Sequence, residues 1–211
     1  MWFGQREKTW YPLIACILSD EEAILLNDPM KANPKASRPG ASEYAPYYGR
    51  YISLVPDGDI LSLLPVQVDE TLTLLRSVPE SHAGHRYASG KWSIKEVVGH
   101  VIDAERVFAY RALRFARRDQ TPLSGFEQDD YVRNGSFDGN LLSDLSAELE
   151  QVRRASVLLF RHLDQEAWAR SGVASGNEVS VRALAYIIAG HELHHREILR
   201  TRYLDPPLSD R

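Results

Sequence analysis

The sequence predicts an all-α protein built as a four-helix bundle. Four segments of about 18–26 residues carry apolar side chains at helical spacing. No segment shows the apolar–polar alternation of a half-buried strand, and the one Asn-Gly pair, Asn134-Gly135, lies in a polar stretch. Of the 211 residues, 44% are hydrophobic and 26% are charged, which suits one packed domain with an extension.

Local signals bound each predicted helix. The helices are expected at about residues 59–76, 93–118, 141–163 and 180–203. The first ends ahead of Pro79, the second begins with a Ser-x-x-Glu capping box, and the fourth is capped by a serine. The first helix is expected to bury the stripe Ile60, Leu64, Val68, Leu72 and Leu75. The third is expected to bury Leu145, Leu149, Val152, Ser156, Leu159 and Leu163.

The chain ahead of the bundle has a different composition. Residues 1–29 are rich in aromatic side chains, and residues 30–47 hold proline, glycine and small polar residues without periodicity. We therefore divide the chain into an N-terminal extension and linker over residues 1–47 and a helical domain over residues 48–205. The extension is either an arm that folds over the bundle or the result of a start assigned upstream of a true initiator at Met30.

Charge and cysteine content limit the classes of function. A formal net charge of −4 at pH 7 does not favour a nucleic-acid partner, and no stretch approaches the roughly 18 apolar residues that a membrane-spanning helix needs. Cys16 is the single cysteine, which excludes an intramolecular disulfide and favours a reducing compartment. Residues 13–16 have the form of a lipoprotein cleavage box, but Pro12 interrupts the short apolar run before it. We expect a cytoplasmic protein.

Three histidines carry the predicted chemistry. His191 and His195 are four residues apart on one predicted helix, so both imidazoles lie on the same face, one turn apart. His100 is in phase with the apolar residues of the second helix and therefore points into the bundle. Neutral imidazoles suit one divalent ion, Zn²⁺ or Ni²⁺, with Mn²⁺ or Fe²⁺ as alternatives. Three protein ligands leave coordination positions for water or substrate.

Two other interpretations use the same residues. A histidine on an apolar helix face is commonly a hydrogen-bonded core residue, so the metal prediction depends on the three histidines together. Residues 191–195, His-Glu-Leu-His-His, also match the His-Glu-x-x-His signature of zinc proteases, with Glu192 as the general base. Ile198 and Thr201 stand where the extended signature needs Gly and His. Glu192 also lies about 100° around the helix from His191, so the protease interpretation is weak.

Two motifs in this order resemble the DinB-like superfamily. Residues 91–100, KWSIKEVVGH, resemble the second helix of that family, and residues 190–195, GHELHH, resemble its fourth-helix signature. Residues 122–131 are similar to the connecting loop of its YfiT-like branch. The resemblance spans roughly residues 50–204 and leaves residues 1–47 unmatched.

This resemblance implies a divalent metal site at His100, His191 and His195 in a bundle that forms a homodimer. Characterised members of the family include thiol S-transferases that use bacillithiol or mycothiol and a mycothiol-dependent maleylpyruvate isomerase, whereas YfiT-like members carry a metal-dependent hydrolase label. We therefore expect a metal-dependent enzyme that transfers a small-molecule thiol to an electrophilic substrate. The alternatives are a metal-dependent hydrolase and a stress-related metal-binding protein without turnover.

Charged residues near His100 are further candidates. Asp103 follows it by one turn, where a carboxylate would hydrogen-bond a ligand imidazole, and a solvated charge is the alternative. Arg106, Arg111 and Arg114 are candidates for contact with an anionic substrate or a partner, or else form a solvated helix end. No catalytic side chain is assigned, because water or a thiolate on the metal would be the nucleophile.

Overall fold

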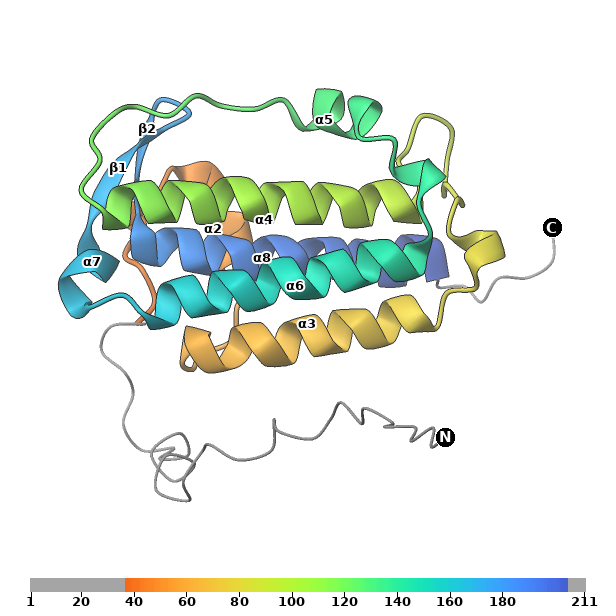
Figure 1. The fold of residues 1–211 in the computed structure, drawn as a ribbon, viewed down its shortest axis with the longest axis horizontal. Helices are drawn as coiled ribbons and strands as arrows, with labels where there is room; N and C mark the ends of the chain where they lie inside the picture. The colour runs from red at the N-terminus through yellow and green to blue at the C-terminus, as the bar shows by residue number, and fades with distance from the viewer. Residues whose placement is uncertain (1–36, 205–211) are drawn as a thin grey trace, which may run out of the picture. The chain divides into compact units, whose positions relative to one another are not determined.

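Four long helices lie side by side and form the body of the protein (Figure 1). They are α3 (Ile60–Arg76), α4 (Ile94–Ala116), α6 (Leu142–Arg161) and α8 (Val181–Ile198). Helices α4 and α3 each contact both α6 and α8, so the four helices surround a shared core. The all-α four-helix bundle predicted from the sequence is confirmed.

The computed structural model describes residues 37–204. The predictions about Cys16, the cleavage box and residues 1–29 lie outside this range. Among the described residues, no helix has both the length and the apolar character that crossing a membrane requires.

The long helices begin where the local signals place them. Asp59 and Ser180 cap α3 and α8 with side-chain oxygens that accept backbone N–H groups. Ser93 and Glu96 form both hydrogen bonds of the predicted capping box at the start of α4. The predicted stripe of α3 is buried throughout: Ile60, Leu64, Val68, Leu72 and Leu75. Beyond α8 the chain continues as a π-helical segment, η6 (Leu199–Leu204).

The buried face of α6 differs from the predicted stripe. Val152 and Leu159 are only half-buried, whereas Arg153, Val157 and Phe160 are buried. The other predicted positions are buried as expected: Leu145, Leu149, Ser156 and Leu163. An arginine on a helix ordinarily indicates a solvated face, and the face of α6 was misplaced because its arginine points inward.

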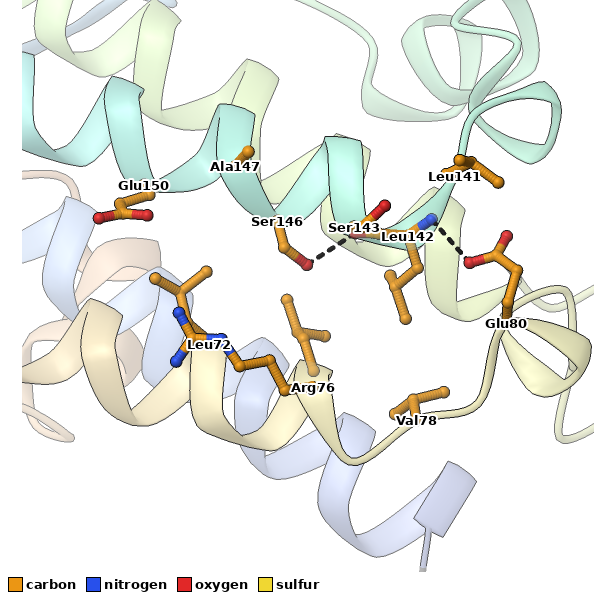
Figure 2. A pocket seen from close by; sticks show the side chains of 11 residues that line it. Leu72, Arg76, Val78, Glu80, Leu141, Leu142, Ser143, Ser146, Ala147 and Glu150 are labelled. Carbon is orange, nitrogen blue, oxygen red and sulfur yellow. Dashed lines mark hydrogen bonds between the residues drawn. The ribbon is translucent and has the colours of Figure 1, made fainter.

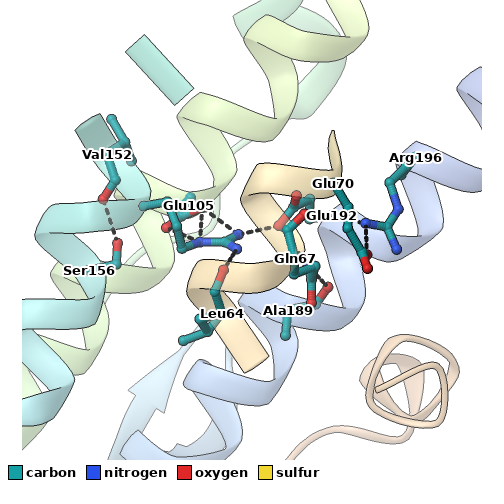
Figure 3. Close-up of polar contacts among 10 residues, drawn as sticks. Leu64, Gln67, Glu70, Glu105, Val152, Ser156, Ala189, Glu192 and Arg196 are labelled. Carbon is teal, nitrogen blue, oxygen red and sulfur yellow. Dashed lines mark hydrogen bonds and ion pairs between the residues drawn. The ribbon is translucent and has the colours of Figure 1, made fainter. Parts of the chain in front are cut away.

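Arg153 joins all four long helices from the centre of the core. Its guanidinium donates to both carboxylate oxygens of Glu105 on α4, the shortest contacts being 2.9 Å, and pairs with Glu192 on α8 at 2.6 Å. It also donates to the carbonyl oxygen of Leu64 on α3 at 3.1 Å, and Gln67 of α3 donates to Glu192 at 2.6 Å. Figure 3 shows these carboxylates and the Leu64 carbonyl converging between the helices. The relative positions of the helices are therefore set by charge as well as by apolar packing.

We expect Arg153→Met to destabilise the protein by about 3–5 kcal/mol, because it leaves two carboxylates buried without a cation. The matched control is Arg154→Met, since Arg154 pairs with Glu150 on the exposed face and its loss costs at most about 0.5 kcal/mol. Urea denaturation of both variants measures the difference in the free energy of unfolding. Equal losses in the two variants would contradict a central role for Arg153.

A short antiparallel hairpin precedes α8, contrary to the prediction of no strands. Strand β1 (Ser171–Ala174) pairs with β2 (Asn177–Ser180) across the two-residue turn Ser175-Gly176. Both turn residues have positive φ, 53° and 75°, as a type I′ turn requires. The Ser-Gly pair was the signal in the sequence, but strands of four residues are too short for periodicity to reveal.

The remaining connections are short helical turns. These are η2 (Ala41–Glu43), η3 (Pro46–Tyr48), α2 (Gly49–Ile52), η4 (Glu80–His82), α5 (Gln128–Asn134), η5 (Phe137–Gly139) and α7 (Gln165–Ala169). They lie in segments without a long apolar period, so the sequence pattern did not predict them.

The described part of the predicted linker contacts the bundle. Glu43 of η2 accepts hydrogen bonds from Ser180 at 2.8 Å and from Arg182 of α8 at 2.6 Å. Helix α2 packs on α8 at Gly190, where an added Cβ would lie 2.0 Å from the carbonyl oxygen of Tyr51. Only glycine permits this approach, and it brings Tyr51 beside the histidines of α8.

Candidate metal centre

His100, His191 and His195 converge between α4 and α8, and we refer to them as the three-histidine cluster. The four-residue spacing on α8 places two imidazoles edge to face with centroids 4.5 Å apart, and the close packing of α4 brings His100 within 4.9 Å and 4.8 Å of them. One nitrogen from each ring lies within 4.8 Å of the other two. The helical phase of the three histidines predicted that these rings would meet.

The nitrogens face one another rather than solvent. The Nε2 atoms of His100 and His191 are 3.0 Å apart, a hydrogen-bond distance that requires one ring to donate and the other to accept. The residues are 3%, 6% and 9% exposed for His100, His191 and His195. A cation in place of the shared proton would have several nitrogen donors already directed at it.

Burial keeps the cluster neutral. It lowers the pKa of His100 to about 4, with a further contribution from nearby His194. Burial also lowers the pKa of His191 and His195 well below 6.5, and the neighbouring imidazoles and Arg50 add to the effect. Neutral imidazole is the form that binds metal ions, so at neutral pH the cluster is in its ligand form.

The metal-free protein should therefore lose stability as the pH falls from about 6.5 towards 5. Each cluster histidine has a lower pKa in the folded chain than in the unfolded chain, so the unfolded chain binds more protons in this window. Urea denaturation in the presence of a chelator at pH 7.5, 6.5 and 5.5 measures the slope. The slope should decrease in His100→Asn and be unchanged in His162→Asn, and a flat wild-type profile would contradict burial of neutral rings.

Aromatic rings surround the cluster. Trp92 lies 4.8 Å from His100, and Tyr51 and Phe108 lie 5.3 Å and 6.0 Å from His191, measured between ring centroids. Burial raises the pKa of Tyr51 to about 12, so its hydroxyl stays protonated at neutral pH. These rings shield the cluster from water and add no charge to it.

The carboxylates considered in the sequence analysis lie elsewhere. Asp103 is 3.8 Å from Arg106 on the outer side of α4, and within residues 37–204 it makes no hydrogen bond to a histidine. Glu192 points into the core towards Gln67 and Arg153, as its angular position on the helix indicated. Neither carboxylate is placed to remove a proton at the cluster.

A cavity of about 290 Å³ opens onto two of the cluster histidines. His100 and His191 lie in its wall together with Phe108. Three connecting segments supply much of the rest of its lining: Tyr47, Tyr48, Tyr51, Phe126, Glu127, Gln128, Asp129 and Ser175. The tyrosines were not predicted as site residues, because they lie in or next to the segment 30–47, whose composition is typical of a linker.

Arg111 is also in the wall of this histidine cavity. Of the three arginines considered from the sequence, it alone lines the cavity; Arg106 pairs with Glu148 and Arg114 pairs with Asp119.

A second cavity, of about 530 Å³, lies between α3 and α6 (Figure 2). Its lining is mainly apolar, with Glu80, Arg76 and Glu150 as its charged residues. Glu80 accepts a hydrogen bond from the backbone of Leu142 at 3.0 Å. No histidine lines this cavity, so its chemistry does not resemble that of the cluster.

A four-helix bundle with three buried histidines between two of its helices defines the class of this protein. The model of the DinB superfamily matches residues 66–199, which include all three histidines. The chain belongs to the DinB superfamily, as the two sequence motifs indicated.

Known proteins agree with this assignment. A protein of Oceanobacillus iheyensis, provisionally named a metal-dependent hydrolase, is 29% identical over 124 residues, which are 57% of this chain and 70% of that protein. YfiT from Bacillus subtilis, described as a metal-dependent hydrolase candidate with an unusual four-helix bundle topology, superposes with a TM-score of 0.57 at 16% identity. The superposition covers 77% of this chain and 91% of YfiT.

The structure of a mycothiol-dependent maleylpyruvate isomerase is similar as well. Its TM-score is 0.59 at 12% identity, over 74% of this chain and 64% of the isomerase chain. The chain thus spans less than two thirds of the isomerase. At these identities the two structural similarities establish a shared fold.

Proposed function

We propose that this protein is a divalent-metal-dependent enzyme and that His100, His191 and His195 hold the metal. The observation that carries the proposal is the convergence of three buried, neutral imidazoles, with ligand nitrogens within 4.8 Å of one another, beside a cavity. Three nitrogen ligands with positions left open are typical of catalytic rather than structural zinc sites. Zn²⁺ or Ni²⁺ fits this donor set, and Mn²⁺ or Fe²⁺ is the alternative.

The proposed reaction is transfer of a low-molecular-weight thiol to an electrophilic substrate. A divalent cation, when bound, stabilises the deprotonated form of a thiol or water at its open position. The chain contributes the three imidazoles that hold the cation and the aromatic wall that keeps water away from it. Residues 37–204 contain no cysteine, so the sulfur nucleophile would come from a small molecule.

The position of the carboxylates favours a thiol over water. A free thiol has a pKa near 8.5, far below the pKa of water, so it needs less help to ionise. Glu192 and Asp103 are not placed as general bases, and Glu127 and Asp129 lie exposed at the rim of the cavity. Hydrolysis is the second candidate function, and the name of the Oceanobacillus iheyensis relative supports it.

Metal analysis tests the proposed ligands. Purified protein should hold about one equivalent of a divalent metal, and His191→Ala should lower the affinity at least about tenfold, because removing a ligand costs more than removing its outer hydrogen-bond partner. The control is His194→Ala, since His194 is next to the cluster histidines but outside the group that can share an ion. Elemental analysis of both folded variants decides the matter, and equal metal content would overturn the assignment.

Turnover assays separate the candidate functions. The metal-loaded protein should conjugate a panel of small thiols, glutathione among them, to a chromogenic electrophile, and a chelator or His191→Ala should abolish the reaction. Hydrolysis of chromogenic esters without added thiol would instead support the hydrolase. Activity with neither panel would support a metal-binding protein without turnover.

The homodimer and the cytoplasmic location stay predictions. The molar mass in solution, from light scattering, tests the first directly.

A further inference from the structure

Arg111 is buried without a negatively charged partner. The residue is 3% exposed, and its guanidinium donates to the carbonyl oxygen of Ser124 and the hydroxyl of Ser175, both at 3.0 Å. Both acceptors are neutral. Within residues 37–204 it forms no ion pair with a carboxylate.

Arg153 shows what a buried arginine requires in this same chain. It and Arg111 are the two buried arginines of the described residues, and Arg153 has the carboxylates of Glu105 and Glu192. Less buried arginines with exposed fractions of 21–25% also have carboxylate partners: Arg114, Arg170, Arg182 and Arg196. A buried cation without a counter-charge is costly, so the uncompensated charge of Arg111 points to a ligand that supplies the anion.

Arg111 lines the same cavity as His100 and His191. His100, Phe108 and Arg111 follow one face of α4 at helical spacing and all line the cavity of about 290 Å³. The ring centroid of Phe108 is 5.8 Å from the Arg111 guanidinium carbon and 6.0 Å from the ring centroid of His191. A small molecule in the cavity would thus have a cation at one end, an aromatic face beside it and the cluster at the other end.

We propose that Arg111 binds the carboxylate of a small anionic substrate whose apolar part lies along Phe108 towards the three-histidine cluster. This inference rests on the proposed function and adds the substrate class to it. A planar guanidinium matches a carboxylate with two parallel hydrogen bonds. Glu127 and Asp129 at the rim repel anions, which disfavours a more highly charged phosphate relative to a carboxylate.

Three probes that share a phenyl ring test the charge that Arg111 selects. Benzoate, benzamide and phenyl phosphate share the apolar ring, and isothermal titration measures their affinities for the metal-loaded protein. We expect benzoate to bind at least about tenfold more tightly than benzamide, since hydrogen bonds between two charged groups are stronger than those from a charged donor to a neutral acceptor. Equal affinities for benzoate and benzamide, or tighter binding of phenyl phosphate than of benzoate, would overturn the proposal.

Two variants test whether Arg111 causes the preference for benzoate over benzamide. Arg111→Gln should lose it, whereas Arg106→Gln should retain it, because Arg106 lies outside the cavity and pairs with Glu148. In wild-type protein the Nε–Hε resonance of Arg111 should shift with benzoate and not with benzamide, which keeps the proposal testable should Arg111→Gln fail to fold. A preference that survives in Arg111→Gln, or a resonance that does not move, would leave Arg111 a purely structural role.

The failure of this proposal is distinguishable from the failure of the proposed function. His191→Ala should keep the preference for benzoate even where it lacks metal, because the anion is bound by Arg111. Loss of the preference in His191→Ala together with its retention in Arg111→Gln would place the carboxylate at the cluster and overturn the inference. Metal content and turnover are measured separately and decide the function itself.

Discussion

The buried ion pairs of Arg153 are the constraint on which the arrangement of the bundle depends. They join Glu105 on α4 to Glu192 on α8, the same two helices that carry the cluster. Glu192 directly follows His191 in the chain, so a shift of α8 that separated the imidazoles from His100 would also pull Glu192 away from Arg153. Buried ion pairs are weak evidence for stability, and their effect here is to hold two helices in one alignment. The fold thereby brings the three imidazoles together.

Burial explains why three basic rings coexist in the core. The imidazoles are uncharged at neutral pH because burial disfavours their protonated form, so the rings do not repel one another. Tyr51 closes over them only because Gly190 lets α2 approach α8 to backbone contact. The ion pair of Glu192 on one side of α8 and the close approach of α2 at Gly190 on the other therefore both adjoin the cluster. Both features keep solvent from the one group of residues with metal-binding chemistry in the described structure.

Features set by local periodicity could be predicted from the sequence, whereas features set by tertiary contacts could not. The cluster was predictable because helical periodicity alone directs His191, His195 and His100 inward. The inward turn of Arg153 was not, since only its distant partners Glu105 and Glu192 distinguish it from a solvated arginine. Helical spacing places Arg111 on the face of α4 that carries His100, but only the folded structure shows that its acceptors are neutral. The β1–β2 hairpin and the tyrosines that line the histidine cavity were not predicted from the sequence. Short elements are stabilised by the surface on which they pack, and that surface is known only once the helices are assembled.

The cavity wall has one more consequence. Its aromatic and acidic lining comes largely from connections outside the four long helices, and Tyr48 and Tyr51 precede residue 66, where the superfamily match begins. These connections contribute no residue to the Arg153 ion pairs or to the three-histidine cluster. A substitution there can therefore change which compounds enter the cavity without changing any of the three ligating side chains. The shape of the cavity mouth is thus set largely by the connections, whereas the charge preference assigned to Arg111 is set on α4, beside the ligand His100.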